Sequence, residues 1–410
     1  MYSLAVDIKA ATEGVDRQEL VSLMESLTVV EGSRHRAALS DLALELAQKA
    51  AGFRRSLPRS LLTSLATLVR GVNCYYSNLI EGHDTHPVDI ERALKEDYSK
   101  DSKKRDLQME ARAHIAVQQW IDDGRLKDRA ATADAVRETH RRFCELLPED
   151  MLFVEDPGTK ERIPVIPGQL RTREVAVGTH VAISHGAVPR FLERFEQVYG
   201  GLGRADAILS AAAAHHRLLW IHPFLDGNGR VARLISHAML LETLGTGAIW
   251  SVARGLARNV QEYKQHLAKC DQVRRNDLDG RGNLSEEALA EFTRFFLTIC
   301  IDQVTFLERL MQPDKLRTRI QVWTEEEIRL GALPRKAGSI LEAVLYRGEL
   351  PRGEAAKTVG GSDRNARRIA AALIDAGVLV SESSRAPLRL AFPAALASRW
   401  MPGLFPEKTG

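Results

Sequence analysis

The sequence predicts a mainly α-helical protein with one short β-hairpin near its middle and a smaller mixed unit at its C-terminal end. Long stretches place apolar residues three and four positions apart, which is the spacing of one helix face, whereas period-two alternation is confined to short runs. The 410 residues are 44% hydrophobic and 27% charged. This is the composition of an ordinary globular protein, long enough for two or three domains.

Helical spacing appears first in residues 36–50 and 58–81, and Gly82 interrupts it after the second stretch. Further helices are expected at 104–122, 130–146, 188–200, 204–219, 229–244, 258–275 and 285–311. The clearest strand signal lies between Arg173 and Ile183, around a Gly-Thr turn. We therefore expect a helical body with one inserted hairpin.

The composition changes near residue 312, where Pro313 ends the last long helix. A charged helical stretch follows to Leu330, and residues 331–334 are expected to form a linker. From residue 335 to about residue 393 the pattern indicates three helices followed by two strands. These observations predict a separate C-terminal unit.

Charge and cysteine content exclude several classes of protein. The net charge of +3 is too small for a chain that binds nucleic acid over its whole surface. Cys74, Cys144, Cys270 and Cys300 are scattered without a Cys-x-x-Cys pair, so neither a zinc site nor a disulfide framework is expected. The N-terminal residues do not resemble a signal peptide, and no run approaches about 20 apolar residues. We expect a cytoplasmic protein with no membrane partner.

Residues 222–233, HPFLDGNGRVAR, concentrate the chemistry of the chain. Pro223 ends the preceding helix at His222. Gly227 and Gly229 permit unusual backbone angles around Asn228, so that successive N–H groups can converge on an anion. The helix that follows points its N-terminus at the same place, which favours phosphate.

The side chains of this segment fit the same interpretation. The apolar residues of the new helix form one buried face, namely Val231, Leu234, Ile235, Ala238 and Met239. Arg230 and Arg233 lie one turn apart beside the glycines and suit a polyphosphate. Asp226 offers an oxygen ligand for Mg²⁺, and His222 can accept a proton from an attacking hydroxyl. Each feature alone is commonly structural, but their coincidence within twelve residues favours a phosphate site.

The segment resembles the motif of the Fic family, with every defining position filled, and the resemblance extends over roughly residues 60–310. It implies a protein adenylyltransferase that uses ATP and Mg²⁺. By this resemblance His222 is the general base and Asp226 the metal ligand. The resemblance also implies a triphosphate site made of Gly227, Asn228, Gly229, Arg230 and Arg233.

Two further regions resemble parts of the same family. The hairpin Arg171–Ile183 is similar to the flap that pairs edge-to-edge with a target segment, a recognition mode based on backbone hydrogen bonds. The expected flap positions are Val175, Ala176, Val177 and Gly178. Asn259 and Tyr263 resemble residues that wall the adenine pocket, although an Asn and a Tyr four apart on a helix are common.

Ser77 and Glu81 share a helix face, and Glu81 stands in the last turn before Gly82. A carboxylate there opposes the helix dipole, so local stability does not explain it, although a solvated glutamate is the ordinary interpretation. The pattern Ser-x-x-x-Glu-Gly resembles the inhibitory helix of one Fic class. In that class the glutamate pairs with the second arginine, here Arg233, and so inhibits the enzyme.

The C-terminal unit resembles a winged helix-turn-helix with helices at 337–346 and 352–359 and a third helix capped by Ser362. Arg364, Arg367 and Arg368 would share one face of that helix, opposite Ile369, Leu373 and Ala376. The wing would be formed by strands at 378–381 and 387–391. Such a basic face suits DNA, and a protein-binding or dimerisation module is the equal alternative.

The expected organisation is an N-terminal helical region at 1–110 with the inhibitory helix at about 60–82, a Fic core at 111–312, a helical linker at 313–334 and a winged helix-turn-helix at 335–410. The expected activity is transfer of AMP from ATP to Ser, Thr or Tyr hydroxyls of a target on the flap, or of the chain itself. The alternatives are AMP removal, use of another nucleotide such as UTP or CDP-choline, and a nucleotide-sensing DNA-binding regulator. The sequence does not identify the target or establish whether the chain forms a homodimer.

Overall fold

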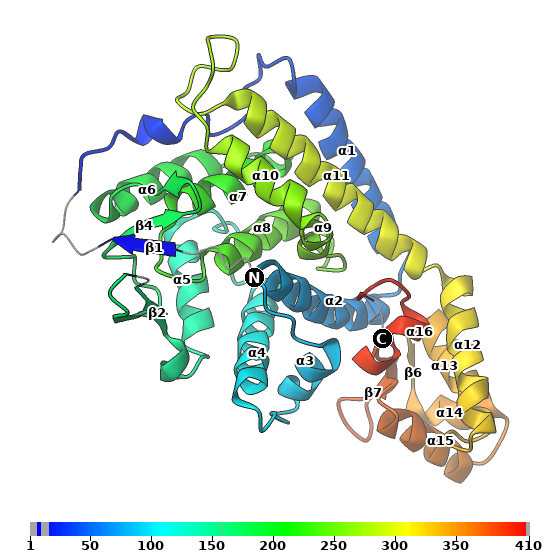
Figure 1. Ribbon diagram of the computed structural model, residues 1–410. Coiled ribbons are helices and arrows are strands. Elements are labelled where there is room, and N and C mark those ends of the chain that lie inside the picture. Colours follow the sequence, from blue (N-terminus) through cyan, green and yellow to red (C-terminus); the bar gives the residue numbers. More distant parts are fainter. Residues whose placement is uncertain (1–5, 10–15, 157, 407–410) are drawn as a thin grey trace.

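The computed structural model describes residues 6–9, 16–156 and 158–406, and it is mainly helical, as predicted (Figure 1). The helices before the C-terminal unit are α1 (Arg36–Arg55), α2 (Arg59–Ile80), α3 (Pro87–Leu94), α4 (Ser102–Asp122), α5 (Ala133–Cys144), α6 (Val188–Tyr199), α7 (Arg204–Ile221), α8 (Asn228–Leu244), α9 (Val252–Arg258), α10 (Val260–Cys270), α11 (Glu286–Leu310) and α12 (Pro313–Arg329). All of the predicted helices are present, and α3 and α9 are additional.

The helix predicted at 258–275 is wrong at both ends. Asn259 leaves the helical conformation (φ −121°, ψ 36°) and separates α9 from α10, while its side-chain amide donates to the Gly255 carbonyl at 2.9 Å. This side-chain bond to the backbone competes with helix continuation. Beyond Cys270 the chain turns around Asp279, whose carboxylate accepts hydrogen bonds from Ser285 and from the Glu287 backbone.

Helix α7 forms the centre of the core, packed against α1, α6, α8 and α11. It is buried on every side because Ala211–Ala214 let the neighbouring helices approach closely. The predicted apolar face of α8 is fully buried. Together α7 and α8 place the segment between them, residues 222–227, at a fixed point of the fold.

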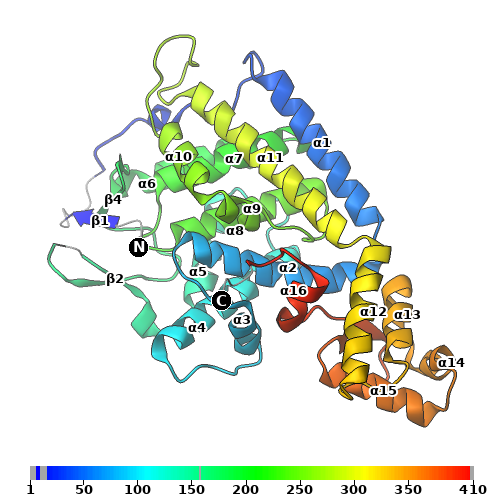
Figure 2. The same cartoon turned by 45° about the vertical axis from the view of Figure 1, so that its right-hand side comes forward.

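The hairpin is built from β4 (Glu174–Val177) and β5 (His180–Val181), with Ala176 opposite Val181 and Val177 opposite His180. A strand that the sequence did not predict, β1 (Val6–Lys9), pairs antiparallel with the other edge of β4. A separate hairpin, β2 (Phe153–Glu155) with β3 (Arg162–Pro164), precedes the flap. Figures 1 and 2 place this sheet region and the C-terminal unit on opposite sides of the helical body.

The C-terminal unit contains α13 (Ala337–Arg347), β6 (Glu349–Leu350), α14 (Ala355–Val359), α15 (Asp363–Asp375), β7 (Leu379–Val380), β8 (Leu388–Leu390) and α16 (Ala397–Trp400). Its sheet order is β6-β8-β7. Ser362 caps α15, and the three predicted arginines of that helix are exposed. Ala376, expected on the buried face, is exposed because it follows the last turn of α15. The winged-helix assignment stays a prediction.

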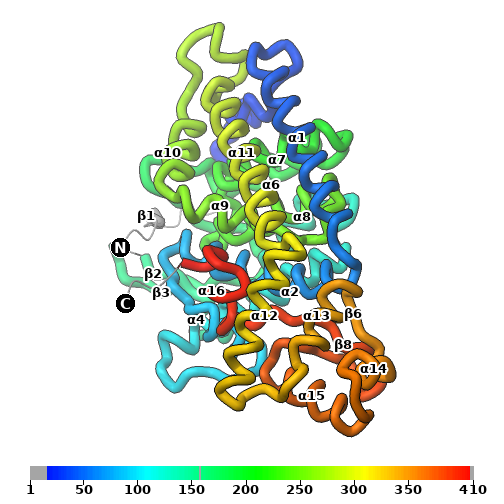
Figure 3. The backbone as a smooth tube through the Cα atoms, turned by 90° about the vertical axis from the view of Figure 1, so that its right-hand side faces the viewer, coloured from blue at the N-terminus to red at the C-terminus, as the bar shows by residue number. Residues whose placement is uncertain are grey.

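After α16 the chain returns to α2, as the tube view shows (Figure 3). The Tyr76 hydroxyl donates to the Leu404 carbonyl at 2.9 Å, and the Arg254 guanidinium donates to the same carbonyl at 3.2 Å. The Phe405 ring lies edge-on to Tyr75, 5.4 Å between centroids. The tail therefore covers the outer face of α2. None of the helices within the described ranges is long and apolar enough to cross a membrane.

Candidate functional site

The loop between α7 and α8 reverses the chain through two residues with left-handed backbone angles. His222 has φ 51° and Gly227 has φ 78°. Glycine adopts this region freely, whereas for a histidine it is uncommon and costs about 1 kcal/mol or more. The surrounding structure therefore has to hold His222 in place.

Arg171 supplies that support. Its guanidinium Nε donates to the His222 carbonyl at 2.8 Å, and its backbone N–H donates to the Pro223 carbonyl at 2.8 Å. The same guanidinium donates to the carbonyls of Arg173 and Ile183, at the two ends of the flap. One buried arginine thus fixes the β4–β5 hairpin and the loop at residues 222–227 relative to each other, a role that the sequence pattern did not reveal.

The side chain of Asn228 bridges the loop between α7 and α8 through two hydrogen bonds to the Phe224 backbone. Its side-chain amide donates to the Phe224 carbonyl at 2.8 Å and its Oδ1 accepts from the Phe224 N–H at 3.0 Å. Phe224 in turn stacks on His140, 3.9 Å between centroids. The Asn228 side chain therefore shapes the loop, and its polar groups are directed inward.

A cavity of about 580 Å³ lies over this loop. It is lined by nearly all of the residues expected to bind nucleotide, metal and hydroxyl, namely His222, Asp226, Gly227, Asn228, Gly229, Arg230, Arg233 and Tyr263, together with Glu81, Val177 and Gly178. Asn259 is not among them; it lines a different cavity with Glu262 and His266. The structure thus brings together the motif, the helix carrying Glu81 and the flap tip.

Arg233 is held by the end of α2. Its Nη2 lies 2.5 Å from the Glu81 Oε1, and its Nε donates to the Ser77 hydroxyl at 2.8 Å. The Arg233 side chain is 4% exposed and that of Glu81 is 25% exposed. Burial alone would raise the pKa of Glu81, but Arg233 and then Arg230 outweigh it and hold this pKa below its ordinary value. Glu81 is therefore ionised at neutral pH.

The Glu81 carboxylate also covers the first turn of α8. A Cβ atom on Gly229 would collide with Glu81 Oε1, so a larger residue here would force the carboxylate to move. Glu81 caps the C-terminal end of its own helix, where a negative charge is unfavourable, yet it faces the N-terminal end of α8, where it is favourable. The carboxylate thus lies where the loop and helix are built to receive an anion.

Arg230 has a second, independent carboxylate partner. Its guanidinium pairs with Glu110 of α4, and Glu110 Oε2 lies 2.8 Å from His83 Nδ1. Burial would raise the pKa of Glu110, but Arg230 and His83 keep it lowered. The hydrogen bond to Glu110 raises the pKa of His83. Glu110 and His83 lie about one hundred positions or more before the motif, so local spacing gave no sign of them.

His222 lies at the cavity wall as a neutral imidazole. Burial, together with Arg171 and His180, lowers its pKa to about 3, so the imidazole is neutral at pH 7. His180 of the flap is anchored by its Nε2, 2.8 Å from the Trp220 carbonyl. A neutral imidazole at the cavity wall can accept a proton from a hydroxyl presented along the flap.

Tyr263 reaches the cavity wall from α10. Its hydroxyl lies 2.6 Å from His215 Nε2, and His215 Nδ1 lies 2.9 Å from the Ser236 hydroxyl on α8. Burial lowers the pKa of His215 to about 3 and raises that of Tyr263. This neutral chain of hydrogen bonds fixes α10 against α8 at the wall of the cavity.

Asp226 is exposed and lines the cavity beside Gly227. Within the ranges that the structure describes, no group of three or more His, Cys, Asp or Glu side chains is placed to hold a metal by itself. One carboxylate beside a polyphosphate site fits Mg²⁺, which typically binds through one or two carboxylates and substrate phosphates.

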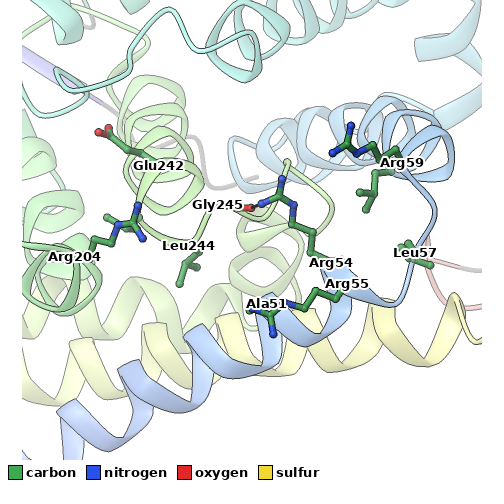
Figure 4. A pocket seen from close by; sticks show the side chains of 11 residues that line it. Ala51, Arg54, Arg55, Leu57, Arg59, Arg204, Glu242, Leu244 and Gly245 are labelled. Atoms are coloured by element: carbon green, nitrogen blue, oxygen red, sulfur yellow. Dashed lines mark hydrogen bonds between the residues drawn. The ribbon is translucent and has the colours of Figure 1, made fainter.

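A second cavity, of about 490 Å³, has a different character (Figure 4). Arg54, Arg55, Arg59 and Arg204 line it, with Glu242 at one side. Arg54 donates to the Gly245 carbonyl at 2.5 Å. None of the motif residues lies there, so the 580 Å³ cavity is the candidate active site.

Comparison with known proteins agrees with this geometry. A sequence model described as the Fic/DOC family matches residues 130–240. "Protein adenylyltransferase Fic" of Drosophila erecta is 27% identical over 169 residues, which is 41% of this chain and 31% of that protein. The protein of the same name from Drosophila yakuba is 36% identical over 80 residues, 19% of this chain and 16% of that one. The chain thus spans about a third or less of the length of these curated relatives.

A crystal structure of a Fic family protein from Desulfovibrio desulfuricans covers 89% of this chain and 98% of its own, with a TM-score of 0.51 and 16% identity. At this identity the likeness concerns the fold. The match to residues 130–240 includes the flap, α7 and the complete motif. Residues 130–240 of this chain are therefore similar to the Fic/DOC family.

Proposed function

We propose that this protein transfers AMP from ATP to hydroxyl groups of target proteins. The observation that carries the proposal is the cavity in which a neutral His222, the N-terminus of α8 and two arginines converge beside the flap. The name of the curated relatives supports the same reaction class. Cavity geometry alone does not choose the nucleotide, and ATP is proposed from the motif.

In this reaction the target hydroxyl attacks the α-phosphorus of ATP and pyrophosphate leaves. His222 accepts the hydroxyl proton, while the α8 N-terminus and Arg230 bind the phosphates. Asp226 would hold Mg²⁺, which supplies charge neutralisation for the phosphates when bound. Arg171 fixes the position of His222 relative to the flap. A hydroxyl presented at the flap then lies close to the proposed base.

We further propose that Glu81 inhibits this reaction. Its carboxylate holds Arg233 and lies over Gly229, where a terminal phosphate of ATP would be received. A negative charge already at this position repels a second one and removes the arginine that would bind it. In the resting protein His222 is then available as the base, while Glu81 occupies the phosphate site.

The test is intact-mass spectrometry of purified Glu81→Gly protein incubated with ATP and Mg²⁺, with UTP and CDP-choline in parallel. A mass gain of one AMP with ATP, absent in Glu81→Gly/His222→Ala, is expected. The expected loss on removing the base is about 10²- to 10⁴-fold. No gain with any of the three nucleotides would contradict the proposal and favour a nucleotide-sensing regulator. A mass gain with UTP or CDP-choline alone would show that the donor is that nucleotide and not ATP.

A further inference from the structure

The flap is not a free hairpin, because a third strand is already paired with it. Strand β1 aligns antiparallel with β4 over four residue pairs, from Val6 opposite Val177 to Lys9 opposite Glu174. The sheet order β1-β4-β5 makes β4 the central strand. Figure 1 shows the blue arrow of β1 beside β4. The edge of β4 that would receive an incoming strand is therefore covered by the chain's own N-terminal segment.

The backbone directions show which residues of β1 and β4 face each other across this edge. The Val175 carbonyl accepts from the Ala182 N–H at 3.1 Å, so the polar groups of Val175 face β5. Neighbouring residues of a strand face opposite ways, so those of Ala176 face β1. Asp7 is opposite Ala176 and forms the hydrogen-bonded pair with it, whereas the N–H of Ile8, opposite Val175, points away from β4.

The residues that follow β1 in the described part of the chain are fastened beside the flap. Arg190 of α6 lies 2.7 Å from Asp16, and the Ser184 hydroxyl lies 2.6 Å from the Glu19 carboxylate. The absence of a side chain at Gly186 admits the Asp16 backbone. A short tether from such an anchor keeps a segment at an effective concentration of the order of millimolar. These contacts of Asp16 and Glu19 thus favour pairing of β1 with β4 over pairing of a strand that must come from solution.

We propose that β1 competes with target proteins for the β4 edge, so that a target docks only by displacing the protein's own N-terminal strand. The inference rests on the proposed function in taking the flap as the docking edge. The edge leads to the catalytic cavity, since Val177 and Gly178 at the end of β4 line that cavity. A four-residue edge pairing is short enough to be exchanged for a longer strand.

The decisive experiment measures peptide binding without nucleotide, so its result does not depend on catalysis. A fluorescent peptide with the sequence of residues 1–15 is titrated to about 1 mM against the full-length chain, with anisotropy as readout. Two prolines at adjacent positions form the matched pair. Asp7→Pro removes one of the N–H groups that face β4, and Ile8→Pro removes one that faces away.

The Asp7→Pro protein is expected to bind the peptide at least about tenfold more tightly than wild type, because its edge is vacated. Ile8→Pro is expected to behave like wild type. Adding Ala176→Pro, which removes the β4 donor on this edge, is expected to abolish binding by the Asp7→Pro protein. Equal binding by wild type and both proline variants, or no binding by any of them, would overturn the proposal, whatever the outcome with ATP.

Discussion

The two ends of the proposed active-site cavity are obstructed in physically different ways. At the proposed nucleotide end, a nearly buried arginine is paired with Glu81, and the contact depends on two particular side chains. At the proposed target end, β1 covers β4 through backbone pairing, to which any residue except proline can contribute. The first obstruction should therefore respond to single side-chain changes, and the second mainly to changes that remove backbone donors.

The largest difference should come from removing the carboxylate. If the partly buried pair contributes about 1–3 kcal/mol, Glu81→Gly should raise self-labelling with ATP roughly 5- to 150-fold. Glu81→Gln keeps the size of the side chain and a hydrogen-bond acceptor but removes the charge. Its activity should therefore lie between those of wild type and Glu81→Gly. Labelling with radioactive ATP measures the effect. Equal labelling of wild type and Glu81→Gly would remove the inhibitory role.

A second substitution tests whether Glu81 occupies the anion site. In Gly229→Ala the new Cβ collides with the Glu81 carboxylate, which has to shift at the expense of its hydrogen bond to Arg233, so the protein should be destabilised by about 0.5–1.5 kcal/mol. In a Glu81→Gly background the colliding group is gone, so most of this cost should disappear. Urea unfolding of the four proteins gives the coupling. Additive effects would mean that Glu81 lies elsewhere in solution.

The local parts of this site were predictable, and the long-range parts were not. Residues 222–233 contain the loop, the helix phase and both arginines within twelve positions, so their arrangement follows from spacing. Glu110 pairs with Arg230 from α4, and Arg171 donates a hydrogen bond to the His222 carbonyl from the segment before β4. Neither contact produces a periodic pattern in the sequence. Strand β1 was missed because four residues carry too little pattern to indicate a partner almost 170 positions away.

Asn259 illustrates a different failure. Its spacing to Tyr263 is that of one helix face, and the prediction assumed a continuous helix at 258–275. Its side chain instead bonds to the Gly255 carbonyl and interrupts that helix. Tyr263 reaches the 580 Å³ cavity that contains the motif, while Asn259 lines another cavity. Asparagine commonly competes with helical hydrogen bonds in this way, so helical spacing is weak support for its position.

Weakening the β1 pairing at the proposed target end should have a smaller effect, and this effect should appear in the KM for the protein target. In the Glu81→Gly background, Asp7→Pro should lower the KM for a protein target by about tenfold, equivalent to about 1.4 kcal/mol, and leave the KM for ATP unchanged. Ile8→Pro is the matched control. Because the two obstructions act on separate ligands, their free energies should add. A change in the KM for ATP alone would place the action of β1 at the nucleotide end.

The smallest expected effect concerns His222, the proposed base, and the pH range of this effect separates it from that of the Glu81 pair. The pKa of His222 is lowered to about 3 in the folded protein, whereas an unfolded histidine titrates near 6.5. As pH falls through 6.5 the unfolded chain gains a proton that folded His222 does not accept, so its stabilising contribution is lost. Between pH 7.5 and 5.5 this amounts to about 1 kcal/mol. The lowered pKa of Glu81 acts only below its ordinary value of 4.5, outside this window.

Urea unfolding at pH 7.5 and 5.5 compares wild type with His222→Asn, since asparagine tolerates the left-handed backbone at this position. The variant should lose about 1 kcal/mol less on acidification than wild type. Glu81→Gly should lose as much as wild type over the same interval, because its missing carboxylate does not titrate there. An identical loss in wild type and His222→Asn would mean that the pKa of His222 is the same in the folded and unfolded protein, and that burial does not lower it.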